Sequence, residues 1–200
     1  MGAWTSGQPH PVLPGMPVTC APGIDRIPAQ VWAEIIADPA TASRYYAQVW
    51  RGTGHWWWTG ALDGSGHGSI WVHRRQVSAH ALGWQLSHGV AQPFAGEMPV
   101  IRHACDNASC QRPACLLAGT AAENAADYQA RRWRTGSPLA DIRGARGRAV
   151  AVRDAILSAG RDGTPAEEAI ERALAAGIPA GQEPLPMEFG SGGRTLSIKL

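Results

Sequence analysis

Residues 103–116 read HACDNASCQRPACL, and residues 119–127 read GTAAENAAD. The first stretch places Cys105, Cys110 and Cys115 five residues apart each time. In a protein of the cell interior, clustered thiols bind metal more often than they form disulfides, so this spacing favours a metal site. Zinc prefers four tetrahedral nitrogen or sulfur ligands, and the spacing alone does not choose the fourth ligand among seven histidines. Cys20 lies far away in a proline-rich stretch and is not expected to be a ligand.

The composition limits the classes of protein to which the chain can belong. Its 200 residues suit one domain with appendages or two small domains, and they can bury a core without disulfides. The sequence has no run of 18 apolar residues, which argues against a membrane span. Its first residues lack the basic segment and apolar core of a secretory signal. We therefore expect a cytoplasmic protein with no membrane partner.

Positive charge is concentrated in one segment. The formal net charge of the chain is +2, but residues 131–153 contain seven arginines and a single aspartate, a local charge of +6. Arginine presents a planar fork that suits phosphate oxygens and guanine edges. On charge alone, a solvated helix face and a nucleic-acid surface are equally good interpretations of this segment.

Composition and periodicity divide the chain into five parts. Residues 1–23 are a proline- and glycine-rich arm, and residues 24–50 are helical. Residues 51–135 carry the cysteine cluster and are expected to form the core. Residues 136–180 form an arginine-rich helical extension, and residues 181–200 are a tail.

Short helices and strands are expected throughout these parts. The pattern predicts helices from residue 28 to a break near residues 38–39, and at 42–49, 81–88, 121–134, 145–158 and 165–176. It predicts strands at 56–62, 69–73, 76–79 and 99–103, with the first two arranged around a turn at 63–66. Thr120 and Glu123 are placed to form a capping box at the start of the helix at 121–134.

Four blocks of sequence resemble the ββα-metal nucleases, also called HNH or His-Me finger nucleases. The similarity is to the zinc-bearing branch, which includes homing endonucleases and many phage proteins. Its pattern is Cys-Trp-x-Trp-Thr-Gly, then His-x-Cys-x-Asn-x-x-Cys, Pro-x-His-Leu and Gly-Thr-x-x-x-Asn-x-x-Asp; this chain has HWWWTG, HACDNASC, PACL and GTAAENAAD in that order. The resemblance spans residues 50–135 and implies an α+β fold. It also implies a ββα-metal core with a small antiparallel sheet, a zinc-stabilised loop, and additional N- and C-terminal helices.

The chain departs from the family pattern at two positions that compensate each other. His55 stands where the pattern has its first cysteine, and Cys115 stands where it has the histidine of Pro-x-His-Leu. Three thiolates and one imidazole are therefore kept. The resemblance implies a structural zinc ion bound by His55, Cys105, Cys110 and Cys115. Cysteines buried in an ordinary core are the alternative.

The resemblance also implies a catalytic site. His103 matches the histidine that family members use as a general base, and Asn124 matches the asparagine that binds the catalytic cation, Mg²⁺ or another divalent ion. Arg75 stands where some relatives place an arginine on the scissile phosphate, and Arg74 competes with it for that role. Asn107 is expected to brace the zinc loop or His103.

The other histidines and the tryptophans have simpler interpretations. His80 matches a histidine common in phage relatives, and we expect it to be structural. Three histidines without motif context are expected at the surface: His67, His73 and His88. Trp56 and Trp58 share one face of a strand and are expected to pack around the zinc. Base stacking by Trp57 or Trp71 is the less favoured alternative.

For a nuclease of this type, DNA contact becomes the favoured interpretation of the arginine segment. The arginines expected to contact DNA are Arg131, Arg132, Arg134, Arg143, Arg146 and Arg148. Residues 143–148 are expected to be flexible enough to enter a minor groove. The strand pair that carries Trp71, Arg74 and Gln76 is expected to contact the major groove.

The sequence therefore predicts a metal-dependent endonuclease that hydrolyses phosphodiester bonds in double-stranded DNA. Homing relatives act as two-fold dimers because each site cuts one strand, so a homodimer is expected. A phage or plasmid nickase and a restriction nuclease are alternatives. A zinc protein that binds DNA without cutting it is the alternative from another class, and retention of both His103 and Asn124 argues against it. DNA binding would associate this cytoplasmic protein with the nucleoid.

Overall fold

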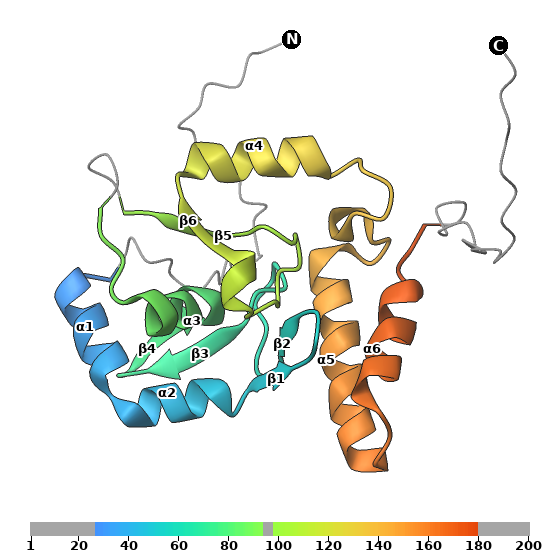
Figure 1. The fold of residues 1–200 in the computed structure, drawn as a ribbon, viewed down its shortest axis with the longest axis horizontal. Coiled ribbons are helices and arrows are strands. Elements are labelled where there is room, and N and C mark those ends of the chain that lie inside the picture. Colours follow the sequence, from blue (N-terminus) through green and yellow to red (C-terminus); the bar gives the residue numbers. More distant parts are fainter. Residues whose placement is uncertain (1–26, 94–97, 180–200) are drawn as a thin grey trace, which may run out of the picture.

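The computed structural model describes residues 27–93 and 98–179. The predicted arm with Cys20 and the predicted tail lie outside these residues. The described chain combines helices with three separate two-stranded antiparallel sheets, in agreement with the expected α+β class (Figure 1). No helix in this part of the chain is long and apolar enough to cross a membrane.

Two short helices form a corner at the beginning of the described chain. α1 (Ala29–Ala37) and α2 (Pro39–Tyr46) meet at Asp38, whose backbone is extended. The Asp38 carboxylate accepts hydrogen bonds from the Ala40 N–H and the Thr41 hydroxyl, both at 2.9 Å, and so caps α2. α2 begins earlier than predicted because this cap and the proline after it initiate a helix. It also ends earlier, because residue 49 begins a strand.

The strands form local hairpins. β1 (Val49–Arg51) pairs with β2 (Trp56–Trp58), β3 (Ser69–Val72) pairs with β4 (Arg75–Ser78), and β5 (Val100–His103) pairs with β6 (Leu116–Gly119).

The predicted turn at 63–66 is present, but the pairing around it is short. One antiparallel bridge, between Leu62 and Gly68, and the hydrogen bond from the Ser69 N–H to the Ala61 carbonyl, at 2.8 Å, join the two stretches there. β2 instead pairs back to β1, and β3 pairs forward to β4. The turn between β3 and β4 consists of His73 and Arg74, with φ of 44° and 64°. Two successive positive φ values give the turn a twist that suits a two-residue hairpin.

The main core surrounds α3 (Ala79–His88), which lies between the β3–β4 and β5–β6 hairpins (Figure 1). Trp32 and Ile35 of α1, Tyr45 of α2 and Trp58 of β2 are buried in the same cluster as Leu82 of α3. Burial of such large side chains is the main stabilising contribution in a domain of this size.

Gly83 allows α3 to approach α2 closely. A Cβ atom at this position would lie 1.9 Å from the hydroxyl oxygen of Tyr45. That hydroxyl donates a hydrogen bond to Oε1 of the buried Gln111, at 3.0 Å. The contact connects the helical corner to the cysteine-bearing loop.

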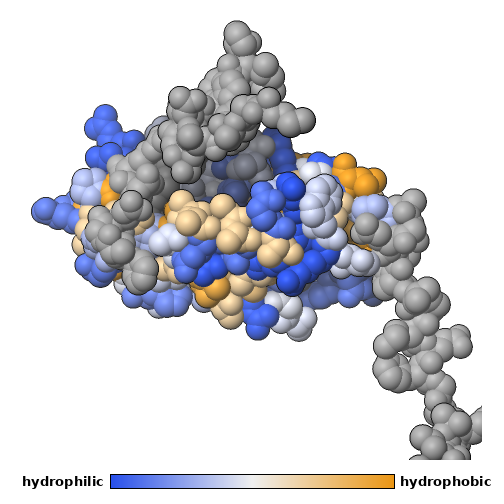
Figure 2. Space-filling model, turned by 90° about the horizontal axis from the view of Figure 1, so that it is seen from above, coloured by the Kyte–Doolittle hydropathy of each residue, from blue (hydrophilic) through white to orange (hydrophobic). Residues whose placement is uncertain are grey.

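Three further α-helices complete the described chain. α4 (Ala121–Arg131) begins with the predicted capping box, in which the side chains of Thr120 and Glu123 each accept the other residue's backbone N–H. Its outer face shows a band of mildly hydrophobic side chains (Figure 2). α5 (Gly144–Asp162) and α6 (Ala166–Ala175) lie side by side as a helical hairpin at one end of the molecule (Figure 1). They pack on β2 through a second apolar cluster of Trp57, Val152, Ile156 and Ile170.

Candidate functional site

The four predicted zinc ligands lie together. Their ligand atoms, from His55, Cys105, Cys110 and Cys115, are all within 4.8 Å of one another. Nδ1 of His55 is 3.5 Å from Sγ of Cys110 and 3.9 Å from Sγ of Cys115. A tetrahedral zinc ion with bonds of about 2.0–2.3 Å separates its ligand atoms by about 3.3–3.8 Å. The cluster therefore offers a structural metal such as zinc a suitable set of donors.

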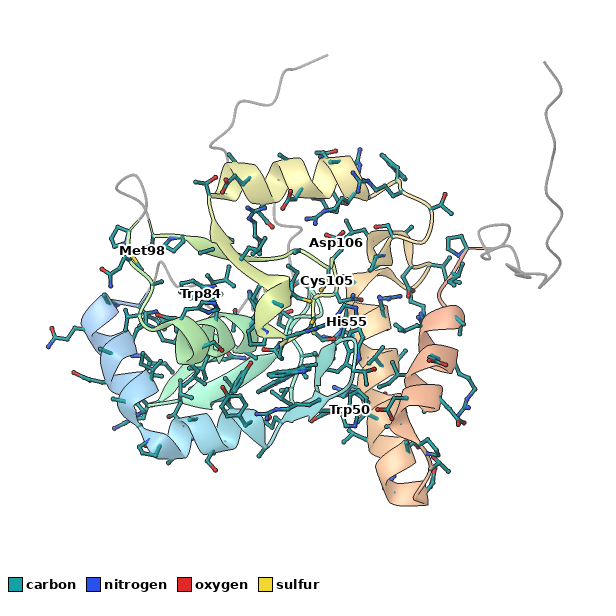
Figure 3. All side chains as sticks on the ribbon, viewed as in Figure 1. Trp50, His55, Trp84, Met98, Cys105 and Asp106 are labelled. Atoms are coloured by element: carbon teal, nitrogen blue, oxygen red, sulfur yellow. The ribbon has the colours of Figure 1, made fainter. Side chains whose placement is uncertain are left out.

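Three segments of the chain supply these ligands. His55 precedes β2, Cys105 and Cys110 lie in the loop after β5, and Cys115 ends a 3-10 turn, Pro113–Cys115 (Figure 3). Asn107 holds the loop closed, because its Nδ2 donates to the Cys105 carbonyl and its own carbonyl accepts the Cys110 N–H, both at 3.0 Å. Asn107 thus braces this loop, as predicted.

Without a metal, the three thiols differ in their acidity. Hydrogen bonds from Cys110 and His55 lower the pKa of Cys105 to about 3, against the effect of burial. The contact with Cys105, together with burial, raises the pKa of Cys110, and burial raises the pKa of Cys115. Because zinc binds thiolates, its binding to this cluster would release protons from Cys110 and Cys115.

A pocket of about 590 Å³ lies beside the metal cluster and contains two of the three predicted catalytic residues, His103 and Asn124. His103 reaches it from the end of β5, and Asn124 reaches it from the first turn of α4. The β5–β6 hairpin and the capped start of α4 bring these two residues together. Other lining residues include Asp63, Ser65, His67, Ser78, His80, Arg102, Asp106, Tyr128, Arg131 and Ala145.

Ion pairs hold α4 over the pocket. Arg102 of β5 pairs with Asp127 and lies 4.0 Å from a carboxylate oxygen of Glu123. Arg131 pairs with Asp127 at 3.1 Å and with Asp106 at 3.3 Å. The positive charge of these two arginines is therefore largely balanced by carboxylates of the protein itself.

His103 is oriented by the backbone of the cysteine loop. Its Nε2 lies 3.0 Å from the carbonyl oxygen of Cys110. A carbonyl oxygen can only accept, so Nε2 carries the proton and Nδ1 is left with a free lone pair. Burial lowers the pKa of His103 to about 4, which keeps the imidazole neutral near pH 7. Such a group can accept a proton.

Two further imidazoles surround His103. The ring centroids of His67 and His80 lie 5.5 Å and 4.8 Å from that of His103 and 4.9 Å from each other. Burial lowers the pKa of His67, and it holds the pKa of His80 well below its usual range. Nδ1 of His80 is buried without a hydrogen-bond partner.

The expectation that His67 is an ordinary surface residue is wrong, whereas His73 and His88 are exposed as predicted. The Asp63 carboxylate accepts the N–H groups of Ser65 and His67, and the Ser65 hydroxyl lies 2.7 Å from Nδ1 of His67. These contacts turn the imidazole toward the pocket. The sequence signal at this position is the Asp-Gly-Ser-Gly-His run, which is typical of a turn and does not indicate where the imidazole points.

The other predicted phosphate and groove contacts lie on the β3–β4 hairpin, away from the pocket. Arg74 is in its turn, and Arg75 begins β4 beside it. This end of the hairpin contacts the helical corner, where His73 lies 3.2 Å from Asp38. Gln76 pairs across the hairpin with Trp71, which is 62% exposed. Arg75 is not among the residues that line the pocket of His103, so the structure does not bring these two residues together.

The expectation of a flexible arginine arm at 143–148 is wrong, because Gly144 begins α5. Its arginines bind the protein itself. Arg143 and Arg148 pair with the buried Asp141 at 2.7 Å and 3.3 Å. Arg148 also donates to Oδ1 of Asn107 at 2.8 Å, and Arg146 donates to the backbone carbonyl of Asp63. These contacts join the start of α5 to the cysteine loop and to the turn at residues 63–66, which we call the pocket turn.

The arginines at the end of α4 have different surroundings. Arg131 lines the pocket, whereas Arg132 lies against the rings of Tyr128 and Trp133. Arg134 is exposed. Within residues 27–93 and 98–179, neither Arg132 nor Arg134 forms an ion pair.

Comparison of the chain with protein-family models, with curated proteins and with solved structures gives no match. Two features of the described residues point to a function: the His55 and cysteine cluster, and the adjoining pocket that contains His103 and Asn124.

Proposed function

We propose that this chain is a divalent-cation-dependent DNA endonuclease of the HNH, or ββα-metal, class. The observation that carries the proposal is that His103 and Asn124 line one pocket, with His103 held by the Cys110 carbonyl so that Nδ1 is free. The order β5, β6, α4 supplies two strands followed by a helix, which is the element order of that core.

The chemistry follows from the needs of phosphodiester hydrolysis, which are a base for the attacking water and positive charge for the phosphate. Nδ1 of His103 accepts the proton of the water. Asn124 is placed to hold Mg²⁺ through its amide oxygen, which is a hard ligand. A cation held there would stabilise negative charge on the phosphate and on the leaving 3′ oxygen. Arg102 and Arg131 are already paired with carboxylates of the protein, so they have little positive charge to offer a phosphate. A metal cation would supply the positive charge that the reaction needs.

The zinc cluster would act as scaffolding in this enzyme. It would hold the loop whose Cys110 carbonyl orients His103. Double-stranded DNA is the proposed substrate, and a homodimer would place one active site on each strand. The proposed phosphate contacts are the half-buried Arg132 and the exposed Arg134, neither of which forms an ion pair with the described residues.

The test is cleavage of supercoiled plasmid, linear duplex and single-stranded DNA by the purified chain with Mg²⁺. We expect His103→Ala and Asn124→Ala to lose activity by at least about 100-fold, the usual contribution of a general base. His88→Ala is the matched control, because His88 is exposed on α3, where its ring hydrogen-bonds the Trp84 carbonyl and stacks on the Trp84 ring. Open-circular plasmid would indicate nicking, and linear plasmid would indicate cleavage of both strands.

A DNA-binding protein without nuclease activity would give a different result. The wild-type chain would bind these DNAs, yet it would cut them no faster than His103→Ala does. That outcome, across all three substrates and with Mn²⁺ as well as Mg²⁺, would overturn the proposal.

A further inference from the structure

A row of three side chains leads outward from the pocket along the end of α4. Tyr128 lines the pocket and is 47% exposed, and Trp133 beyond it is 80% exposed. The guanidinium of Arg132 lies 5.7 Å from the ring centroid of Tyr128 and 4.7 Å from that of Trp133. We call Tyr128, Arg132 and Trp133 the aromatic row.

Much of the surface of the aromatic row is open to solvent. Indole is among the largest apolar surfaces a side chain offers, so an exposed one normally gains stability by being covered. Among the described residues, Arg132 has no acidic partner, and its Nε is buried without a hydrogen bond. Arg134 next to Trp133 is exposed. The row therefore combines flat aromatic faces with positive charge not balanced by an ion pair.

These properties select a ligand that is both flat and anionic, and a nucleotide is both. Aromatic rings and guanidinium groups stack on nucleobases, while arginines neutralise the flanking phosphates. Tyr128 forms the pocket wall, so a strand whose phosphate lies beside His103 would place a neighbouring base at the row. In a continuous duplex that base is covered on both faces by its neighbours. It can stack on a side chain only when it is unpaired, or when the duplex is kinked open.

We propose that the aromatic row stacks on an unpaired nucleobase next to the scissile phosphate. The substrate class is accordingly DNA with an unpaired base at that position, such as a bulge or a flap, in preference to continuous duplex. The inference depends on the proposed function for the position of the phosphate, but the stacking itself is measurable without cleavage.

The test uses the full chain carrying His103→Ala, so that DNA is bound but not cut. Its binding is measured by fluorescence anisotropy on a duplex with a one-nucleotide bulge and on the same duplex fully paired. The bulged base is 2-aminopurine, whose fluorescence falls when an aromatic ring stacks on it. We expect about tenfold tighter binding to the bulged duplex, with quenching.

Substitutions then assign the effect to the row. Trp133→Ala should remove the preference and the quenching, whereas Trp133→Phe should keep most of both. Ile142→Ala is the matched control, because Ile142 is 68% exposed and apolar but not aromatic. It should behave like the parent. Trp133 is so exposed that its loss should leave the melting temperature unchanged, and this is checked for each variant.

Three results would overturn the inference. One is equal binding of both duplexes by the parent. Another is an equal loss of affinity for both duplexes in Trp133→Ala, which would indicate a general contact. The third is loss of the preference in Trp71→Ala instead. The proposed function is tested separately. If the chain cuts DNA but its binding preference does not depend on Trp133, the nuclease proposal holds and the stacking proposal fails. If stacking depends on Trp133 but the unsubstituted chain does not cut DNA, the stacking proposal holds and the nuclease proposal fails.

Discussion

Nε2 of His103 lies 3.0 Å from the carbonyl oxygen of Cys110, and the thiol of the same cysteine lies 3.5 Å from Nδ1 of His55. One residue thus connects the metal cluster to the imidazole of the pocket. A displacement of Cys110 would also move the acceptor that fixes the proton on Nε2. We therefore expect that disrupting the metal cluster also disturbs the position and protonation of His103.

This connection predicts the effect of ligand substitutions. His55→Ala removes one donor and should lower zinc affinity by more than about tenfold, since even loss of an outer contact costs 10- to 100-fold. Nuclease activity should fall with the zinc content. His55→Cys should retain zinc, because four cysteines are a common structural set. Metal analysis and thermal melting check both variants, and a full zinc complement in His55→Ala would rule out the four-ligand site.

The close contact between α3 and Tyr45 predicts opposite effects of two glycine substitutions. Gly83→Ala places a methyl group against the buried Tyr45 hydroxyl and should destabilise the chain by about 1–3 kcal/mol. Gly160→Ala lies in α5 with open space around the new methyl group, and should stabilise it by about 0.5–1 kcal/mol. Chemical denaturation measures both. Equal effects of the two substitutions would contradict the packing described.

The contacts of Arg148 predict that it stabilises the fold. Arg148→Ala removes hydrogen bonds to Asn107 and Asp141 and should cost about 1–3 kcal/mol of unfolding free energy. Arg153→Ala is the control, because Arg153 pairs with its exposed neighbour Asp154, and its loss should cost less than about 1 kcal/mol. By contrast, Arg132→Ala and Arg134→Ala should weaken DNA binding in a salt-dependent way while leaving stability nearly unchanged. If Arg148→Ala changed only DNA affinity, its internal role would be refuted.

Asp141 predicts a dependence of stability on pH. Burial alone would raise the pKa of Asp141, but hydrogen bonds from Arg143 and Arg148 outweigh it and hold the pKa below its ordinary value of 3.8. A group whose pKa is lowered by folding stabilises the fold above its unfolded pKa, and that stability is lost as the pH falls through the folded pKa. The stability difference between wild type and Asp141→Asn should thus be full near pH 6 and should shrink below about pH 4. Denaturant unfolding at pH 6, 4.5 and 3.5 measures it, and a difference that stays constant would contradict this role.

Sequence signals predicted the helices better than the strand pairing. The end of α3 at Gly89 and the capping box of α4 depend on local side chains, and both are confirmed. The hairpin turn at His73 and Arg74 was not predictable, because such turns usually contain glycine or asparagine. The glycine-rich stretch at 63–66 does form a turn between antiparallel backbone, but the pairing is limited to one bridge, and the turn also lines the pocket.

The candidate site was also predictable only where it depends on residue type and local spacing. The metal ligands follow from cysteine spacing and the resemblance, because both depend on residue type. The inward position of His67 depends on the Asp63 carboxylate, which no spacing rule reveals. Likewise, the number of arginines indicates charge but not how it is neutralised. At the start of α5, the single carboxylate of Asp141 pairs with both Arg143 and Arg148.

The start of α5 limits how this protein can be divided. The carbonyl oxygen of Ala145 would lie 2.7 Å from a Cβ atom at Gly66, so only glycine lets the pocket turn and α5 meet this closely. Ala145 itself lines the pocket, and Arg146 bonds the Asp63 carbonyl. A fragment that ended before residue 144 would therefore lack one side of its own pocket. The hairpin of α5 and α6 is therefore not a separable module. A fusion or a recombined protein would need to contain this hairpin together with the pocket turn that it contacts.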